Sequence, residues 1–272
     1  MLDKPATKLT IADDMNDLVR FSFSLSPRMQ AFLLLRDGLH CLDAAERTGQ
    51  PYLWLQACID LRASLLGDHG RKPAIPEVLS LFVTMRAHIE KLANDHPRFR
   101  ESIDASCKRI DEHAETLRDG HEEAVRFLSQ DAMIETYLNA QKKQDWLGHK
   151  PCLPQGLAAL WSESEDRQRQ VHEQLGDLAS AAYFLDVMLQ DYVMWEKRTA
   201  YEGCDQITPE RGTHFGLVII GLDPTDAGLG IVPDISGNRL AIRLRFQQWD
   251  AGQPASQVLD DVPYSMMLVP IA

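Results

Sequence analysis

The pattern of apolar, glycine and proline residues changes once along the 272 residues, shortly after Trp195. Before this point, apolar residues recur at alternating spacings of three and four, which is the period of helices that bury one face in a bundle. After it, glycine and proline interrupt short β-rich runs, which is the pattern of strands joined by turns. The sequence therefore predicts an α+β fold with a helical bundle domain and a small antiparallel β-sheet domain.

The helical domain is predicted to occupy residues 26–203. Ser26 and Pro27 favour a helix start, because serine is a common N-cap and proline is tolerated at the first helical position. Gly67 favours a helix end, since glycine readily adopts the left-handed conformation that closes many helices. The predicted helices lie near 28–47, 52–66, 78–92, 103–117 and 131–140, and from 162 to the change near Trp195.

The β domain is predicted to occupy residues 204–272 and to include a strand from the N-terminal segment, 1–25. Apolar and polar residues alternate over 18–25, which is the period of a half-buried strand. Three short strands make a marginal sheet, so we expect this fourth one to join them. The C-terminal strands are predicted at 215–222, 239–246 and 265–271, with turns or loops at 224–230 and 234–238.

Charge and hydropathy narrow the possible partners and location. The formal charge of −12 argues against broad attraction to nucleic acid or to anionic membranes. No window approaches the roughly 20 apolar residues of a membrane span, and the first residues lack the basic and apolar pattern of a signal peptide. We therefore expect a cytoplasmic protein with no nucleic-acid or membrane partner.

Motifs of common enzyme classes are missing from the sequence. It contains no phosphate loop, GxSxG elbow, GxGxxG turn or HExxH helix, and its five cysteines form no CxxC pair. A polar cluster on one predicted helix could in principle bind a metal, although a solvated helix face is the favoured interpretation. Its members are Asp111, Glu112, His113 and Glu115. We expect a non-enzymatic protein without a cofactor or metal.

The most informative local feature is the predicted strand 239–246. Its apolar residues share one face: Leu240, Ile242, Leu244 and Phe246. The opposite face carries Arg239, Arg243 and Arg245. Because guanidinium groups pair bidentately with carboxylates, this face is a candidate dock for a carboxylate-rich peptide. Alternatively, the arginines are solvated or pair with acidic residues of the same chain, such as Asp260 and Asp261.

Two further basic sites are candidates for partner contact. Lys197 and Arg198 are predicted at the end of the last long helix, where they could instead complement the negative end of its dipole. Arg36 lies in the first predicted helix. From the residues alone, Lys197 and Arg198 are open to either interpretation.

Three stretches resemble the ZapD family of bacterial cell-division proteins. Residues 21–29, FSFSLSPRM, with the leucine-rich helix that follows, are similar to the family's opening strand, its Pro-Leu-Asn-Glu turn and an arginine-rich helix. Residues 195–203, WEKRTAYEG, are similar to its aromatic-x-Lys-x-Thr-x-x-x-Gly segment. Residues 235–243, ISGNRLAIR, are similar to its Ile-Ser-Gly turn and Arg-Phe-Ala-Ile-Arg strand.

This resemblance implies a homodimer that binds the C-terminal tail of the tubulin-like protein FtsZ and bundles its filaments, stabilising the Z-ring at the septum. Basic surface residues make that contact in the family, and Arg239, Arg243 and Lys197 match them. The family's two helix arginines fall at Gln30 and Leu34, while Arg36 stands at a position that is usually acidic. A divergent scaffold that binds a different acidic peptide or protein is the alternative.

Overall fold

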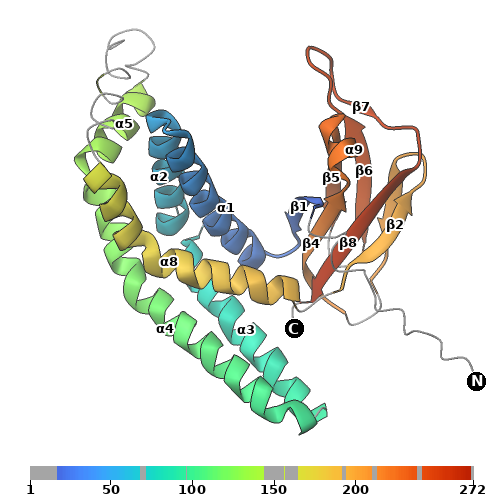
Figure 1. Cartoon of the computed structure of the whole chain (residues 1–272), viewed down its shortest axis with the longest axis horizontal. Coiled ribbons are helices and arrows are strands. Elements are labelled where there is room, and N and C mark those ends of the chain that lie inside the picture. The colour runs from blue at the N-terminus through green and yellow to red at the C-terminus, as the bar shows by residue number, and fades with distance from the viewer. Residues whose placement is uncertain are drawn as a thin grey trace, which may run out of the picture. The chain divides into compact units, whose positions relative to one another are not determined.

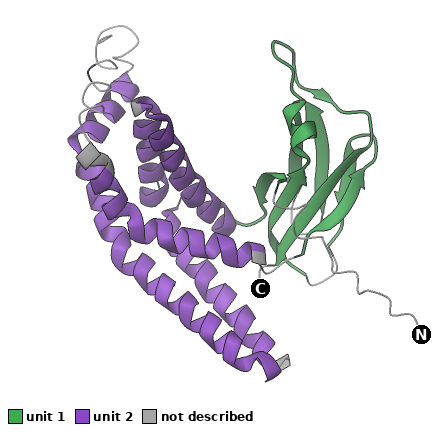
Figure 2. Ribbon diagram, viewed as in Figure 1, with its two compact units in different colours: residues 1–26, 192–271 green, residues 27–191, 272 purple. Residues whose placement is uncertain are grey.

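The computed structural model describes residues 17–67, 72–95, 97–143, 156, 165–191, 194–209, 213–237 and 241–270. The chain divides into two compact units, coloured separately in Figure 2. Unit 1 takes the N-terminal residues through Ser26 together with those from Tyr192 onward, and unit 2 takes the helices that begin at Pro27 and end at Asp191. The predicted α+β fold is confirmed, with the helices in unit 2 and the strands in unit 1.

Unit 2 is built from antiparallel helices, and every helix that the sequence predicts is present (Figure 1). The long helices α3 and α4 lie side by side, as do α4 and α8. No helix in the described part of the chain combines the length and apolar character needed to cross a bilayer. The helices are α1 (Pro27–Thr48), α2 (Pro51–Leu66), α3 (Ala74–Asp95), α4 (Arg100–Gln130), α5 (Ala132–Lys143) and α8 (Glu165–Asp191).

Local sequence signals set several of these helix ends. Gly67 closes α2 in the left-handed conformation, with φ of 76°, and its N–H donates to the carbonyl of Ala63. Asp131 starts α5, because its Oδ1 accepts the N–H groups of Met133 and Ile134 at 2.9 Å each. These bonds satisfy backbone groups that have no partner inside the helix.

The core of unit 2 follows the predicted apolar periodicity. Its largest fully buried side chains include Trp54, Phe32 and Phe82. At Gly120, helices α4 and α8 approach so closely that an added Cβ would lie 2.7 Å from Cβ of Asp177. The bundle therefore combines ordinary apolar packing with one close helix crossing that a small residue permits.

Unit 1 contains two antiparallel sheets where the sequence predicts one (Figure 1). The N-terminal strand does join the C-terminal strands, as predicted. The first sheet has the order β1 (Val19–Ser24), β4 (Phe215–Leu222), β8 (Val262–Pro270) and β2 (Glu196–Ala200). The second has the order β3 (Cys204–Ile207), β6 (Ile242–Gln248) and β5 (Ile231–Gly237), with β7 (Ser256–Gln257) also paired to β6.

The two sheets share one hydrophobic core. Ile242, Leu244 and Phe246 of β6 are at most 2% exposed and cluster with core residues of β4 and β8. The rings of Phe246 and Tyr264 meet edge to face, with centroids 5.6 Å apart. Because one face of each strand is buried in this core, the alternate residues of β6 must point outward.

Two predicted boundaries are wrong, for identifiable reasons. Residues 192–203, predicted in the helical domain, belong to unit 1, because β2 pairs with β8 and then turns back into β3. Gly203 makes this turn at φ of 69°, where an added Cβ would lie 2.1 Å from the carbonyl oxygen of Val258. Residues 234–237, predicted as a turn or loop, continue β5, because β6 supplies a full register of partners.

The predicted turn after β4 contains a short helix, α9 (Pro224–Gly228). Asp223 caps it, and its Oδ1 accepts the N–H of Thr225 at 2.7 Å. Proline at the first helical position supports the same start. The stretch predicted as a turn or loop is therefore a capped helical turn.

Candidate functional site

The outward face of the β3–β6–β5 sheet carries the two described arginines of the predicted dock. Arg243 and Arg245 are exposed, whereas Ile242, Leu244 and Phe246 between and beside them are buried. The predicted alternation of this strand is therefore confirmed over its described residues. We call this surface the arginine face; its side chains are those of Cys204, Gln206, Asp234, Ser236, Arg243 and Arg245.

The arginine face is hollowed by a depression of about 600 Å³. Register places Arg243 between Gln206 of β3 and Ser236 of β5, and it places Arg245 between Cys204 and Asp234. Cross-strand neighbours lie on the same side of a sheet, so both guanidinium groups are surrounded by small and polar side chains.

The described residues leave both guanidinium groups without a partner. Within the described part of the chain, neither Arg243 nor Arg245 forms a hydrogen bond or an ion pair. Asp234 lies across from Arg245, but its carboxylate accepts a long hydrogen bond of 3.4 Å from Gln247. Asp261, one of the acids proposed as an internal partner, instead accepts the N–H of Glu202 at 2.9 Å.

Arg239 lies outside the described residues, so its position on this face stays a prediction. Lys197 and Arg198 lie on β2 in the other sheet and not at a helix end. Lys197 pairs in register with Ser265, on the opposite side of β2 from the shared core. Since the two sheets pack through that core, Lys197 and the arginine face lie on opposite outer surfaces of unit 1.

Arg198 is held by a network that joins the two sheets. Its Nε lies 2.9 Å from Oδ2 of Asp205, its Nη1 lies 2.9 Å from Oε1 of Glu196, and Tyr264 donates its hydroxyl to Asp205 at 2.6 Å. The side chain of Asp205 is only 16% exposed. This geometry makes Arg198 a structural cation, because its charge compensates a nearly buried carboxylate.

The network shifts the proton affinities of its members. Burial alone would raise the pKa of Asp205, but hydrogen bonds from Arg198 and Tyr264 hold it below its usual value. Burial and the hydrogen bond to Asp205 raise the pKa of the Tyr264 phenol. At neutral pH the site therefore holds an ionised aspartate, a neutral phenol and a charged guanidinium.

A cavity of about 990 Å³ borders this network on unit 1. Its lining combines Lys197 and Arg198 with the acids Asp17, Glu196 and Asp223. These opposed charges give the cavity no consistent preference for an anion. Lys197, which is exposed, is its one cation without an ion pair among the described residues.

Arg36 is also held by the protein's own acids. Its guanidinium lies 2.8 Å from Asp37 and 3.1 Å from Asp186, and its side chain is 13% exposed. The contact ties α1 to α8 within unit 2. Arg36 thus resembles Arg198 in its surroundings and differs from the arginines of β6.

The polar cluster of the fourth helix does not assemble into a ligand set. Asp111 pairs with Arg86, and His113 stacks on Phe184 with ring centroids 4.0 Å apart. Burial lowers the pKa of His113, with the nearby Arg109 acting in the same direction. Of the described cysteines, Cys58 and Cys107 are buried, whereas Cys41 and Cys204 are exposed.

Two groups of interacting side chains were not predicted from the sequence. Asp205 and Tyr264 lie far from each other along the chain; the pairing of β2 with β8 brings Tyr264 to Arg198, and the turn at Gly203 brings Asp205 to it. The second grouping, Asp43, Glu46 and His172, joins α1 to α8. Neither a scan against models of known protein families nor a search of curated proteins finds a match to this chain.

Proposed function

We propose that this protein is a non-enzymatic adaptor of cell division that binds carboxylate groups of the FtsZ C-terminal tail through its arginine face. One observation carries the proposal: Arg243 and Arg245 are exposed side by side and unpaired among the described residues, in a protein whose formal charge is −12. Carboxylates are the natural partners of such guanidinium groups. The ZapD-like stretch 235–243, which ends at Arg243, favours FtsZ as their source.

The proposed adaptor acts as a homodimer in the cytoplasm at the division site. Two tail sites in one dimer crosslink filaments through avidity, so that each single contact can be weak. Contact through exposed charges is screened by salt, because the Debye length shrinks to about 8 Å at physiological ionic strength. Filament bundling should therefore weaken steeply as salt is added.

The decisive experiment is cosedimentation of the purified chain with FtsZ polymers, with light scattering as the readout of bundling. We expect Arg243→Glu to weaken tail binding about tenfold or more, because a charge-assisted hydrogen bond contributes about 1.5–3 kcal/mol. Arg239→Glu should act in the same direction. FtsZ that lacks its tail should not sediment with the protein.

Arg118→Glu is the matched control, since Arg118 is exposed on α4 in unit 2 and the charge change is identical. Circular dichroism of each variant verifies that it is folded. Bundling that survives both Arg239→Glu and Arg243→Glu would remove the arginine face from the mechanism.

One observation favours a second candidate, a scaffold of the same fold for another acidic peptide. Arg36 is engaged by Asp37 and Asp186, so the first helix offers no free arginine at that position. If this candidate is correct, the chain binds an acidic peptide in a manner that depends on Arg243, yet does not sediment with FtsZ.

A further inference from the structure

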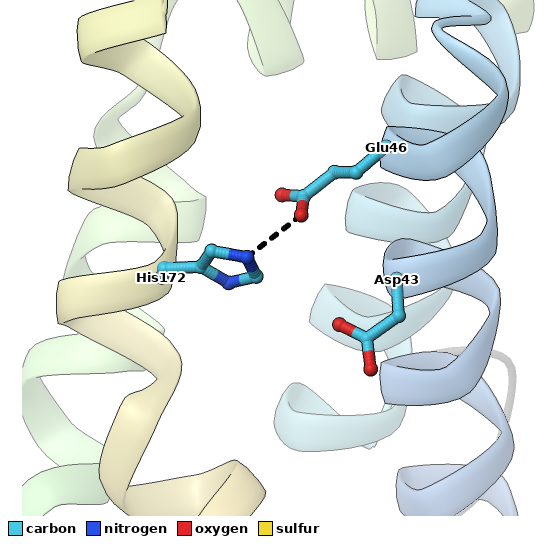
Figure 3. A group of neighbouring side chains, drawn as sticks. All are labelled: Asp43, Glu46 and His172. Atoms are coloured by element: carbon cyan, nitrogen blue, oxygen red, sulfur yellow. Dashed lines mark ion pairs between the residues drawn. The ribbon is translucent and has the colours of Figure 1, made fainter.

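Three potential metal ligands meet between helices α1 and α8 of unit 2 (Figure 3). Asp43 and Glu46 come from successive turns of α1, and His172 reaches toward them from α8. One ligand atom from each residue lies within 4.8 Å of the other two. His172 Nε2 and Glu46 Oε2 are 2.8 Å apart.

The spacing along the helices explains why these side chains converge. Residues three apart lie on the same helix face, so Asp43 and Glu46 both face the groove toward α8. A second contact farther along the same pair of helices, Arg36 with Asp186, shows that α8 runs antiparallel to α1. Packing of the two helices therefore presents the imidazole to the two carboxylates.

The surroundings of Glu46 distinguish this group from a solvated surface cluster. Its side chain is 12% exposed and lies against the imidazole of His172. Its Oε1 is buried, and the neighbouring Trp54 indole acts on this carboxylate without making a hydrogen bond of ordinary geometry. A bound cation stabilises a nearly buried carboxylate, because it neutralises the charge that burial removes from water.

The Asp43 carboxylate is available to the same cation. Asp43 is exposed, and the described residues offer its carboxylate neither a hydrogen bond nor an ion pair. The nearby Arg47 donates to the backbone carbonyl of Asp43 at 3.2 Å and not to its side chain. Both carboxylates are therefore able to contribute oxygen ligands.

We propose that Asp43, Glu46 and His172 bind a divalent transition-metal ion, with Zn²⁺ the best fit, and that this ion clamps α1 to α8. One imidazole and two carboxylates form the kind of mixed nitrogen and oxygen donor set that such ions take, with water completing the coordination. Mg²⁺ and Ca²⁺ fit less well, because they favour oxygen ligands throughout.

Zn²⁺ binding requires only small movements of the ligand side chains. Two ligands about 2.0–2.1 Å from a tetrahedral Zn²⁺ lie roughly 3.3 Å apart, so His172 and Glu46 separate slightly from their present 2.8 Å. The exposed Asp43 side chain closes the remaining gap by rotating about its own bonds. No change in helix packing is needed.

Metal titration of the chelator-treated full chain tests this proposal without any protein partner. We expect one Co²⁺ per chain with visible d–d absorption bands, displacement of Co²⁺ by Zn²⁺, and a higher melting temperature with metal bound. Mg²⁺ at the same concentration should cause neither change. The result is independent of FtsZ binding, so failure here leaves the proposed adaptor function untouched.

Substitutions of the proposed ligand residues test whether the ion binds at this site. His172→Asn and Asp43→Asn should each weaken Co²⁺ binding about tenfold or more, and both positions are exposed enough to be changed without loss of the fold. The controls are two substitutions at exposed positions, His214→Asn in unit 1 and Glu173→Gln beside His172. Both should bind Co²⁺ like the parent. Absence of Co²⁺ binding at millimolar metal, or equal binding by ligand variants and controls, would overturn the proposal.

Discussion

Arg198 and Arg243 are both arginines on strands of unit 1, yet the fold gives them opposite surroundings. Arg198 lies within 2.9 Å of Asp205, a carboxylate that β3 brings to it from the other sheet. Arg243 projects from β6 between Gln206 and Ser236, and neither neighbour carries a charge. An arginine therefore serves structure where an acid lies within ion-pair distance, as Asp205 does for Arg198, and is open to a partner where the described residues place no acid within that distance.

Removing Arg198 should give the largest effect. Arg198→Ala leaves Asp205 ionised and nearly buried without its cation, so we expect a loss of about 2 kcal/mol in the free energy of unfolding. Urea denaturation followed by circular dichroism measures this loss. A variant as stable as the parent would show that the network contributes nothing to unit 1.

Changing Asp205 should give a smaller effect that depends on pH. The folded protein lowers the pKa of Asp205, so its ionised form contributes stability above the unfolded value of 3.8, and this contribution is lost as pH falls through the lower folded value. We expect Asp205→Asn to cost about 1 kcal/mol at neutral pH.

The measurement for Asp205 is the urea midpoint of both proteins from neutral pH down to below 3.8. The gap between parent and variant should narrow as the parent's Asp205 becomes protonated. Tyr264→Phe, which removes one donor to the same carboxylate, serves as the comparison variant. A gap that stays constant with pH would contradict the assignment of the stabilising charge to Asp205.

Neutralising the β6 arginines should give the smallest effect on stability. Arg243→Gln and Arg245→Gln are expected to change the free energy of unfolding by less than about 0.5 kcal/mol, because the exposed side chains have no internal ion pair to lose among the described residues. The same urea experiment measures both. A loss as large as that of Arg198→Ala would assign these arginines to the fold rather than to a partner.

The two glutamate variants sharpen the contrast within the arginine face. Arg245→Glu places a carboxylate across from Asp234, whereas Arg243→Glu faces the neutral Ser236. Like charges directly opposite in a sheet destabilise it, so Arg245→Glu should be the less stable of the two. This difference makes Arg243→Glu the cleaner variant for binding experiments.

Sequence patterns predicted what depends on neighbours along the chain. Helix α1 begins at Pro27 and α2 ends before Gly67, as their capping residues indicate. The alternation around Arg243 correctly predicted which β6 residues are buried. Periodicity reports such features because a residue's own backbone geometry decides which way its side chain points.

The same reasoning failed where a distant strand decided the outcome. Lys197 and Arg198 are predicted at the end of the last long helix, where they could complement the negative end of its dipole, but both lie on β2. Their strand conformation comes from pairing with β8, some 65 positions later in the chain. Local propensity could not anticipate that pairing, since tertiary context overrides it.

Sequence patterns correctly predicted the α+β class, the helices of unit 2, the entry of the N-terminal strand into the β unit and the outward side of β6. Which charges pair inside the protein depends on the fold, which brings Arg198 to Asp205 and Arg36 to Asp186. The physical reason is that periodicity sets the direction of a side chain, whereas a charge's role depends on what the fold brings within about 4 Å of it.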